Sequence, residues 1–456
     1  MLTETTTDPR SVSLSGHAPP GACRPPDDDP WLALWLRVRE FAVPASMIDT
    51  ATARRASGDW AGACAAARVD VDLDLRRISR AHGREIAAQV RRDLRHFAPD
   101  LLRWHLPRVG PDGLLRPGVT MTLARYEVGG EGRRLHLVVR TPPAWADAGQ
   151  RISLTVWDGS GSAYEGPWHP HPRPSARFRL DLHRHLWDAR RAGELGERAG
   201  GRGDSEVLWE GGELEPRWAV DRWIPEAHHV LGRDGRIGVH VGAGRRLVLD
   251  TRTRRIGEGG HELPPLPDAA TWVPPDLRLL RAGLIDAERL HPLVAAALTD
   301  GPVRGMSSAR RAGQPHLVDC RGTPHRIGFV DGRLSALDHA ADELRREELL
   351  VALGGPPLPC LQAIDAVHRR PDALPAVRER LAHGDVRGAF DVLEGLLGPE
   401  ALLRDGPLRD ALENAWLRRI DHGRYRAGLA NPGPPGTPVL RTRRALHLVS
   451  RRALVP

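Results

Sequence analysis

Apolar residues recur at helical spacing through residues 31–107, and this pattern predicts a helical block. The first stripe, in residues 31–41, is apolar nearly throughout and fits either a helix or a buried strand. Further along, Gly58-Asp59 separates two short helical patterns, and Pro99 must end the helix before it because proline removes a backbone donor. These signals agree over the longest run in the chain, so we expect this block to organise the fold.

The period of the apolar positions changes to two after residue 107, which predicts β-strands. Alternation is clear in residues 119–124, 135–139 and 152–156. The connections between these segments are short, so we expect an antiparallel sheet.

An exposed segment and then further strands are predicted after residue 187. Residues 188–204 have no apolar face and predict an exposed loop or linker. Residues 230–231 and 237–241 flank an Asp-Gly step and predict a hairpin, with residues 247–249 as a neighbouring strand.

The C-terminal part of the chain returns to helical patterns. Residues 277–298 and 378–420 predict helices, and between them residues 316–337 predict a strand and a hairpin. Asp338 is the predicted N-cap of the helix that follows, which Gly354-Gly355 should close. The Gly-Asp corner of the first block recurs at Gly384-Asp385.

These patterns predict an α+β fold, with helical N- and C-terminal blocks around a central antiparallel β-rich region. The length favours two or three domains. The expected divisions are a disordered tail (1–30), a helical domain (31–107), a β-rich domain (108–256), a Pro-rich boundary (257–276), an α+β domain with a β-hairpin and a helical hairpin (277–430), and a Pro/Gly-rich and Arg-rich tail (431–456).

The charge of the chain is carried in an unusual way, because all 66 basic residues are arginine and lysine is absent. This usage indicates a GC-rich coding bias, and we interpret the chain as bacterial. The net charge of +8 is a modest excess over 58 interspersed acidic residues, so a nucleic-acid partner is not favoured. Without lysine, a Walker-type phosphate loop and Schiff-base chemistry are excluded.

The four cysteines lie far apart and form no C-x-x-C pair, so the sequence predicts neither a disulfide framework nor a zinc ribbon. The first thirty residues lack the features of a signal peptide, and no apolar run is long enough to span a bilayer. We therefore expect a cytoplasmic protein in a reducing compartment.

Two H-x-H pairs provide the strongest candidate for chemistry, His169 with His171 and His183 with His185. On a strand, each pair would direct both rings to one side, so two neighbouring pairs could hold a transition metal. The alternative is an exposed polar loop beside a strand, since the first pair lies among prolines.

Weaker candidates are an acidic row and two cysteines. Asp70, Asp72 and Asp74 alternate and could hold a divalent cation, but they fail the calcium-loop pattern and are also typical of a solvated face or a helix start. Cys320 could pair with His325 across a turn, although a structural role is favoured, and Cys360 is interpreted as core.

Three functions remain open from the sequence. The absence of a nucleotide, nucleophile or metal signature favours a non-enzymatic interaction or regulatory/accessory protein with an unidentified protein partner. The first alternative is a metal-dependent enzyme that uses the four histidines. The second is arginine-mediated nucleic-acid binding.

Overall fold

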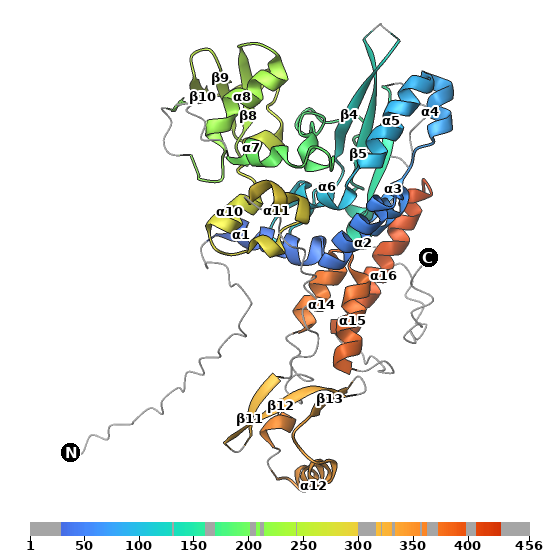
Figure 1. Ribbon diagram of the computed structural model, residues 1–456, viewed down its shortest axis with the longest axis vertical. Helices are drawn as coiled ribbons and strands as arrows, with labels where there is room; N and C mark the ends of the chain where they lie inside the picture. Colours follow the sequence, from blue (N-terminus) through green and yellow to red (C-terminus); the bar gives the residue numbers. More distant parts are fainter. Residues whose placement is uncertain are drawn as a thin grey trace, which may run out of the picture.

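The structure is a computed structural model, and it confirms the α+β fold (Figure 1). It describes residues 29–429 apart from a set of short segments and single residues: 130–131, 160–168, 201–206, 210–213, 243, 300–315, 321, 331–332, 356–357, 363–372 and 398–406. Nearly all of the predicted N-terminal tail, the whole of the C-terminal tail and Cys23 lie outside the described residues.

The N-terminal block is helical, as predicted. Its elements are α1 (Pro30–Arg37), continued by a π-helical turn η1 (Val38–Ala42), then α2 (Ala45–Ala56), α3 (Trp60–Ala66), α4 (Leu75–His82), α5 (Arg84–His96) and α6 (Pro99–His105). The stripe at residues 31–41 is thus a helix, capped by the carboxylate of Asp29. The Gly-Asp corner lies between α2 and α3, where Gly58 has a φ of +80° and Asp59 caps α3.

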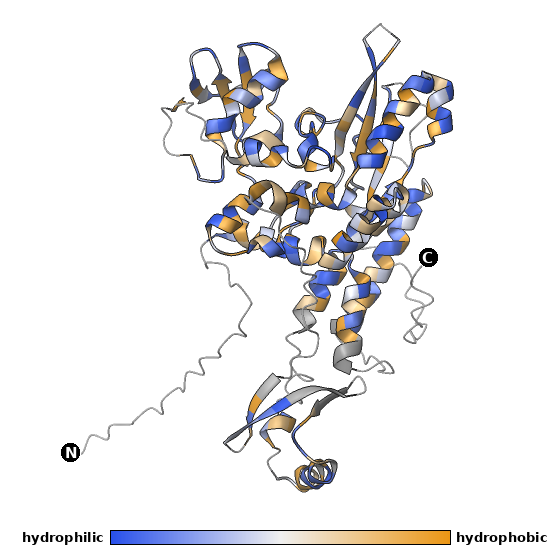
Figure 2. Ribbon diagram, in the orientation of Figure 1, coloured by the Kyte–Doolittle hydropathy of each residue, from blue (hydrophilic) through white to orange (hydrophobic). Residues whose placement is uncertain are grey.

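The central sheet has the strand order β1-β6-β5-β4. Its members are β1 (Val69–Val71), β4 (Thr120–Val128), β5 (Arg133–Arg140) and β6 (Ile152–Trp157). The three long strands are antiparallel, as predicted, whereas the three-residue β1 pairs with β6 in parallel. Helix α5 contacts β4, and Figure 2 shows hydrophilic residues along much of α4 and α5. A two-stranded antiparallel ribbon of β2 (Arg108–Val109) and β3 (Leu114–Leu115) lies between α6 and β4 in the chain.

A second sheet with the order β7-β10-β9-β8 packs on its own helix. The elements are β7 (Leu208–Trp209), α8 (Val220–Leu231), β8 (Arg236–His240), β9 (Arg246–Asp250) and β10 (Arg255–Glu258). The predicted hairpin at residues 230–231 is wrong, because these residues end α8 and Gly232 follows in the left-handed region. The strand predicted at residues 247–249 is confirmed as part of β9, which pairs with β8.

The segment predicted as an exposed loop, residues 188–204, is described up to residue 200, and this part is partly buried instead. It contains α7 (Glu194–Gly200), and Ala192 and Leu195 belong to the main core. The prediction failed because so few apolar residues anchor this segment that they form no periodic pattern.

The described part of residues 29–299 contains two hydrophobic cores. The larger joins the N-terminal helices, the central sheet and the helices after residue 275, and the smaller lies between α8 and the second sheet. The helix predicted at residues 277–298 is two helices, α10 (Pro275–Arg281) and α11 (Pro292–Leu298), which follow α9 (Asp268–Thr271). The short 3-10 turns are η2 (Ala144–Ala146), η3 (Ala148–Gln150), η4 (Arg184–Leu186) and η5 (Ala287–Arg289). The predicted domain boundaries stay a prediction.

The C-terminal part contains a small three-stranded sheet and a set of helices. The sheet has the order β11 (His316–Cys320), β12 (Thr323–Val330) and β13 (Arg333–Ala336), and α12 (Ala341–Ala352) follows it. Helices α14 (Ala373–Ala382), α15 (Val386–Leu397) and α16 (Pro407–Arg426) confirm the helices predicted at residues 378–420. Figure 1 shows β11–β13 and α12 set apart from the central sheet, beyond α14 and α15.

The repeated Gly-Asp corner has the same hydrogen bonding at both places. Asp59 Oδ1 accepts from the backbone N of the residue three positions on at 2.8 Å, and Asp385 Oδ1 does so at 3.2 Å. In each corner an arginine five residues earlier, Arg54 or Arg380, forms an ion pair with the aspartate.

Of the helices that the structure describes, none has both the length and the apolar character needed to cross a bilayer.

Candidate metal centre

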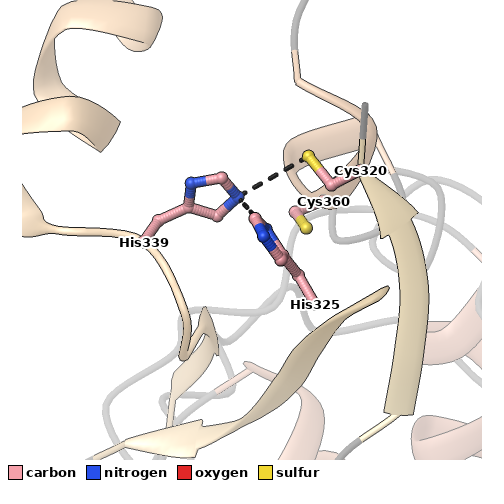
Figure 3. Close-up of side chains that lie close together, drawn as sticks. All are labelled: Cys320, His325, His339 and Cys360. Carbon is pink, nitrogen blue, oxygen red and sulfur yellow. Dashed lines mark hydrogen bonds between the residues drawn. The ribbon is translucent and has the colours of Figure 1, made fainter. Parts of the chain in front are cut away.

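Four side chains of the small C-terminal sheet and its surroundings converge on one point (Figure 3). Cys320, His325, His339 and Cys360 each offer one ligand atom, and these four atoms lie within 4.8 Å of one another. In the described part of the chain, no other group of three or more histidines, cysteines or acidic residues converges in this way. The four residues therefore form the candidate functional site of this protein.

Local structure brings these four ligands together from distant positions in the sequence. Cys320 is the last residue of β11, and His325 lies on the adjacent antiparallel strand β12, where it pairs with Val318, two residues before Cys320. His339 follows β13 in the turn before α12, and Cys360 lies in a short helical stretch at residues 359–362. The strand pairing thus supplies two ligands, and the segments on either side of α12 supply the other two.

The spacing of the ligand atoms is close to that of a tetrahedral zinc site. Zn–S bonds of about 2.3 Å and Zn–N bonds of about 2.0–2.1 Å require neighbouring ligand atoms to be about 3.3–3.8 Å apart. Sγ of Cys320 lies 3.6 Å from Nε2 of His339, and Nδ1 of His325 lies 2.8 Å from the same Nε2. Only shifts of a few tenths of an ångström to about 1 Å would be needed to close the four atoms around an ion.

A carboxylate orients one of the two rings. Nδ1 of His339 lies 3.2 Å from Oε2 of Glu343, one turn further on at the start of α12. This contact places the proton on Nδ1 and leaves the lone pair of Nε2 directed toward Cys320 and His325. A carboxylate behind a histidine ligand is a recurring feature of zinc sites.

An ion pair also fixes the backbone beside both histidines. The backbone N of Arg326, next to His325, donates to Asp338 at 2.7 Å, and the guanidinium of Arg326 donates to the same carboxylate at 2.6 Å. Asp338 precedes His339. The prediction that Asp338 caps α12 is therefore wrong, because its carboxylate is used across the sheet and α12 begins at Ala341 with no side-chain cap.

Both thiols are buried, at 2% exposure for Cys320 and 0% for Cys360. Burial, and then the hydrogen bond to Cys320, raise the pKa of the Cys360 thiol to about 11. This thiol therefore stays protonated at neutral pH unless a cation stabilises the thiolate. A divalent metal ion provides that stabilisation, because a coordinated thiol is deprotonated outright.

The structure separates the two histidine pairs that were predicted to hold a metal. Nε2 of His169 lies 2.9 Å from the carbonyl of Thr141, and Nδ1 of His169 accepts from the backbone N of His171 at 3.1 Å. Nε2 of His183 lies 3.1 Å from Glu226, and the ring of His185 lies 5.8 Å from that of His183. Within the described residues, the four rings do not meet in one group of converging ligand atoms.

The acidic row of the first block is distributed among three separate partners. Asp70 forms an ion pair with Arg151 at 2.5 Å, and Asp72 forms one with Arg426. Asp74 caps α4 by accepting from the backbone N of Arg76 at 2.8 Å. The last contact is the helix-start role that the sequence offered as an alternative to cation binding.

The sequence predicts only part of this centre, the possible pairing of Cys320 with His325. Cys360 was predicted to be a core residue, and His339 was not among the candidate residues. The four ligands follow the spacing C-x4-H-x13-H-x20-C, which matches no compact zinc motif. The available signal was the clustering of two cysteines and two histidines around one predicted strand, hairpin and helix.

Models of known protein families, curated protein sequences and solved structures yield no match to this chain. The class of the protein is therefore defined by its own fold and site. It is an α+β protein with a candidate Cys2His2 metal centre in a small C-terminal unit.

Proposed function

We propose that residues 316–362 bind one structural zinc ion and that the protein is a non-enzymatic interaction or accessory protein. The observation that carries this proposal is the convergence of two thiols and two imidazoles within 4.8 Å. Zinc fits this donor set best, because it combines thiolate and imidazole ligands in tetrahedral sites.

A structural role follows from the number of ligands. Four protein ligands fill a tetrahedral zinc ion, whereas catalytic zinc keeps one position open for water or substrate. Both cysteines are buried, which also keeps a substrate away from the centre. The metal would therefore hold the unit together without performing chemistry.

The unit needs such support because its own core is very small. Among the side chains that the structure describes there, the buried hydrophobic residues are Cys320, Ala336, Leu358 and Cys360, so two of the four are the candidate ligands themselves. Domains of this size rarely fold on apolar burial alone and use metals or disulfides instead.

Helix α12 supports the interaction part of the proposal. Leu349, Leu350 and Leu353 near its C-terminal end are 66%, 51% and 85% exposed. An amphipathic segment of a partner protein would cover these leucines.

Metal analysis of the full chain tests the zinc proposal. After purification without added chelator, we expect about one equivalent of zinc, and less than a tenth of an equivalent in Cys360→Ala and His339→Ala. Cys64→Ala is the matched control, because Cys64 is also fully buried but lies in the main core. If the wild-type protein contains no zinc and Cys320 and Cys360 form a disulfide, a covalent bond links these residues in place of the metal and the proposal is overturned.

Site-specific photocrosslinking in cells tests the interaction part. A photoreactive residue at position 350 should give a discrete adduct with a protein partner, and Leu349→Glu together with Leu353→Glu should abolish it. The exposed position 346 on the same helix is the control. If neither position forms an adduct, or if both do so equally, α12 is not the interaction surface.

A further inference from the structure

A large cleft far from the metal centre separates the two N-terminal cores. Its volume is about 1210 Å³, and its walls come from α1, the β2–β3 ribbon, the segment around Phe178 and the edge of the second sheet. Ligand pockets for small molecules are typically about 300–1,000 Å³, so this space can hold an organic ligand with its solvent.

The walls of the cleft carry more cations than anions, with seven arginines and three carboxylates. Arg177, Arg217 and Arg278 each pair with one of these carboxylates, at 2.6, 2.7 and 3.0 Å. Arg222 pairs with Glu226 at 3.0 Å, which lies outside the lining. The three carboxylates are therefore already neutralised by arginines of the same walls.

Three arginines of the lining have no carboxylate partner among the described residues. Arg108 donates only to the carbonyls of Arg103 and Gly113, and Arg246 donates to the carbonyl of His261. The side chain of Arg116 is exposed. Burial and then the charge of Arg39 lower the pKa of Arg108 to about 9, which marks an uncompensated positive environment.

Three histidines of the lining have ring nitrogens without a hydrogen-bond partner in the described structure, although that of His105 lies 3.5 Å from the carboxylate of Asp276. His185 is only 3% exposed and its Nδ1 is unpartnered, and His240 has an unpartnered Nε2. His240 stands directly opposite Arg246 in the β8–β9 register, so these two side chains approach the cleft together. An unpaired buried nitrogen costs free energy that a ligand oxygen would recover.

The rest of the lining is apolar and aromatic. Trp31, Trp35 and Trp272 are each partly exposed there, while Met121 and Leu180 are buried. Tryptophan and arginine side chains both stack on planar rings.

We propose that this cleft binds a small molecule with a planar ring and two or more phosphate groups, the chemistry of a nucleotide. The phosphates are bound by Arg108, Arg116 and Arg246, and the ring lies against the tryptophans. A small molecule fits better than a nucleic-acid strand, because the three arginines without a carboxylate partner come from separate elements, the β2–β3 ribbon with the residue after it and β9, and do not follow one helix or strand.

Tryptophan fluorescence at physiological ionic strength tests the proposal, with adenosine triphosphate, inorganic tripolyphosphate and an eight-residue oligothymidylate as probes. The variants are Arg116→Ala and Arg246→Ala, and the control is Arg233→Ala, an exposed arginine outside the cleft. We expect saturable quenching by adenosine triphosphate, with the Kd raised roughly tenfold or more by each cleft variant and unchanged in the control. Thermal unfolding verifies that all variants are folded.

The remaining outcomes would each overturn a defined part of the proposal. Absence of saturable binding, or equal weakening in the control, rejects the site. If tripolyphosphate binds as tightly as adenosine triphosphate, the planar ring contributes nothing to binding, and that part of the proposal is rejected. Tighter binding of the oligonucleotide, with a steep salt dependence, replaces the small molecule with nucleic acid. Because the cleft shares no residue with the metal centre, the same titration of Cys360→Ala separates the two proposals.

Discussion

Removal of one metal ligand should unfold the C-terminal unit and leave the rest of the protein intact. Cys360→Ala is the sharpest form of this change, because the Cys360 side chain is fully buried and supplies one of the four converging atoms. Alanine fits in the space of cysteine, so the substitution introduces no steric clash. The loss of metal binding is then the main consequence.

The size of the effect follows from the composition of the unit. Apart from the two thiols, the buried hydrophobic side chains that the structure describes in its core are Ala336 and Leu358, with Val318, Leu344 and Leu361 partly buried against them. Burial of a leucine contributes about 1.5–3 kcal/mol, and an alanine contributes less. Structural zinc contributes about 10–16 kcal/mol in small zinc-binding peptides. Without zinc, we expect the apolar contribution of these side chains to be smaller than the conformational entropy of ordering the unit.

Hydrogen exchange read by mass spectrometry measures this effect segment by segment. In zinc-loaded wild-type protein, the amides of β12 should be protected, and in Cys360→Ala they should exchange at the rate of an unfolded chain. The amides of β4 and β5 should be unchanged in both proteins, because these strands belong to the main core. Cys64→Ala should show the reverse pattern, with β12 protected and the main core weakened.

Unchanged protection of β12 in Cys360→Ala would refute this reasoning. It would show that contacts other than the metal stabilise the unit, such as those between β13 and α15. A uniform loss of protection across the whole chain would refute it in a different way, because it would make the unit part of the main cooperative core.

Three further predictions concern other residues. Glu343→Gln should weaken zinc binding roughly tenfold to a hundredfold, measured by competition with a zinc chelator, because the carboxylate orients His339; unchanged affinity would contradict this role. His169 and His383 are 5% and 0% exposed, and burial lowers their pKa values to about 4 and about 3, so these histidines take up protons in the unfolded chain before they do so in the folded protein as the pH falls below about 6.5. Urea unfolding should therefore show that the free energy of unfolding falls by about 2 kcal/mol for each histidine between pH 7 and pH 5. Equal stability at the two pH values would contradict this prediction. Asp385→Ala should destabilise the protein more than Asp59→Ala, by about 2 against about 1 kcal/mol in the same assay, because Asp385 is buried and also lies 3.6 Å from Arg68; the reverse order would show that the two corners are not comparable.

Hydrophobic periodicity predicted most of the regular structure. The amphipathic stripe that includes Ile86, Val90 and Leu94 forms α5, and the alternation around Leu137 forms β5 in the expected antiparallel register. Two failures lie where an element has too few apolar residues to show a period, whereas the end of α8 was taken for a strand because an Asp-Gly step follows it. Helix α7 is anchored mainly by Leu195, and β1 has only three residues.

The candidate site was harder to predict because three-dimensional pairing creates it. Cys320 and His325 meet through the β11–β12 pairing, which a short sequence separation suggested. His339 and Cys360 arrive from either side of α12, so their convergence depends on how that helix packs against the sheet. The H-x-H pairs were more visible in the sequence, but His169 and His183 are bound to separate parts of the fold, at Thr141 and Glu226.

X-ray absorption spectroscopy at the zinc edge reads the ligand set of the ion in the full-length protein. We predict about one zinc per chain with two sulfur ligands at about 2.3 Å and two nitrogen ligands at about 2.0–2.1 Å. In Cys360→Ala this signal should disappear. Absence of zinc from the wild-type protein, or a first shell of only nitrogen and oxygen, would contradict the assignment of Cys320, His325, His339 and Cys360 as a metal centre.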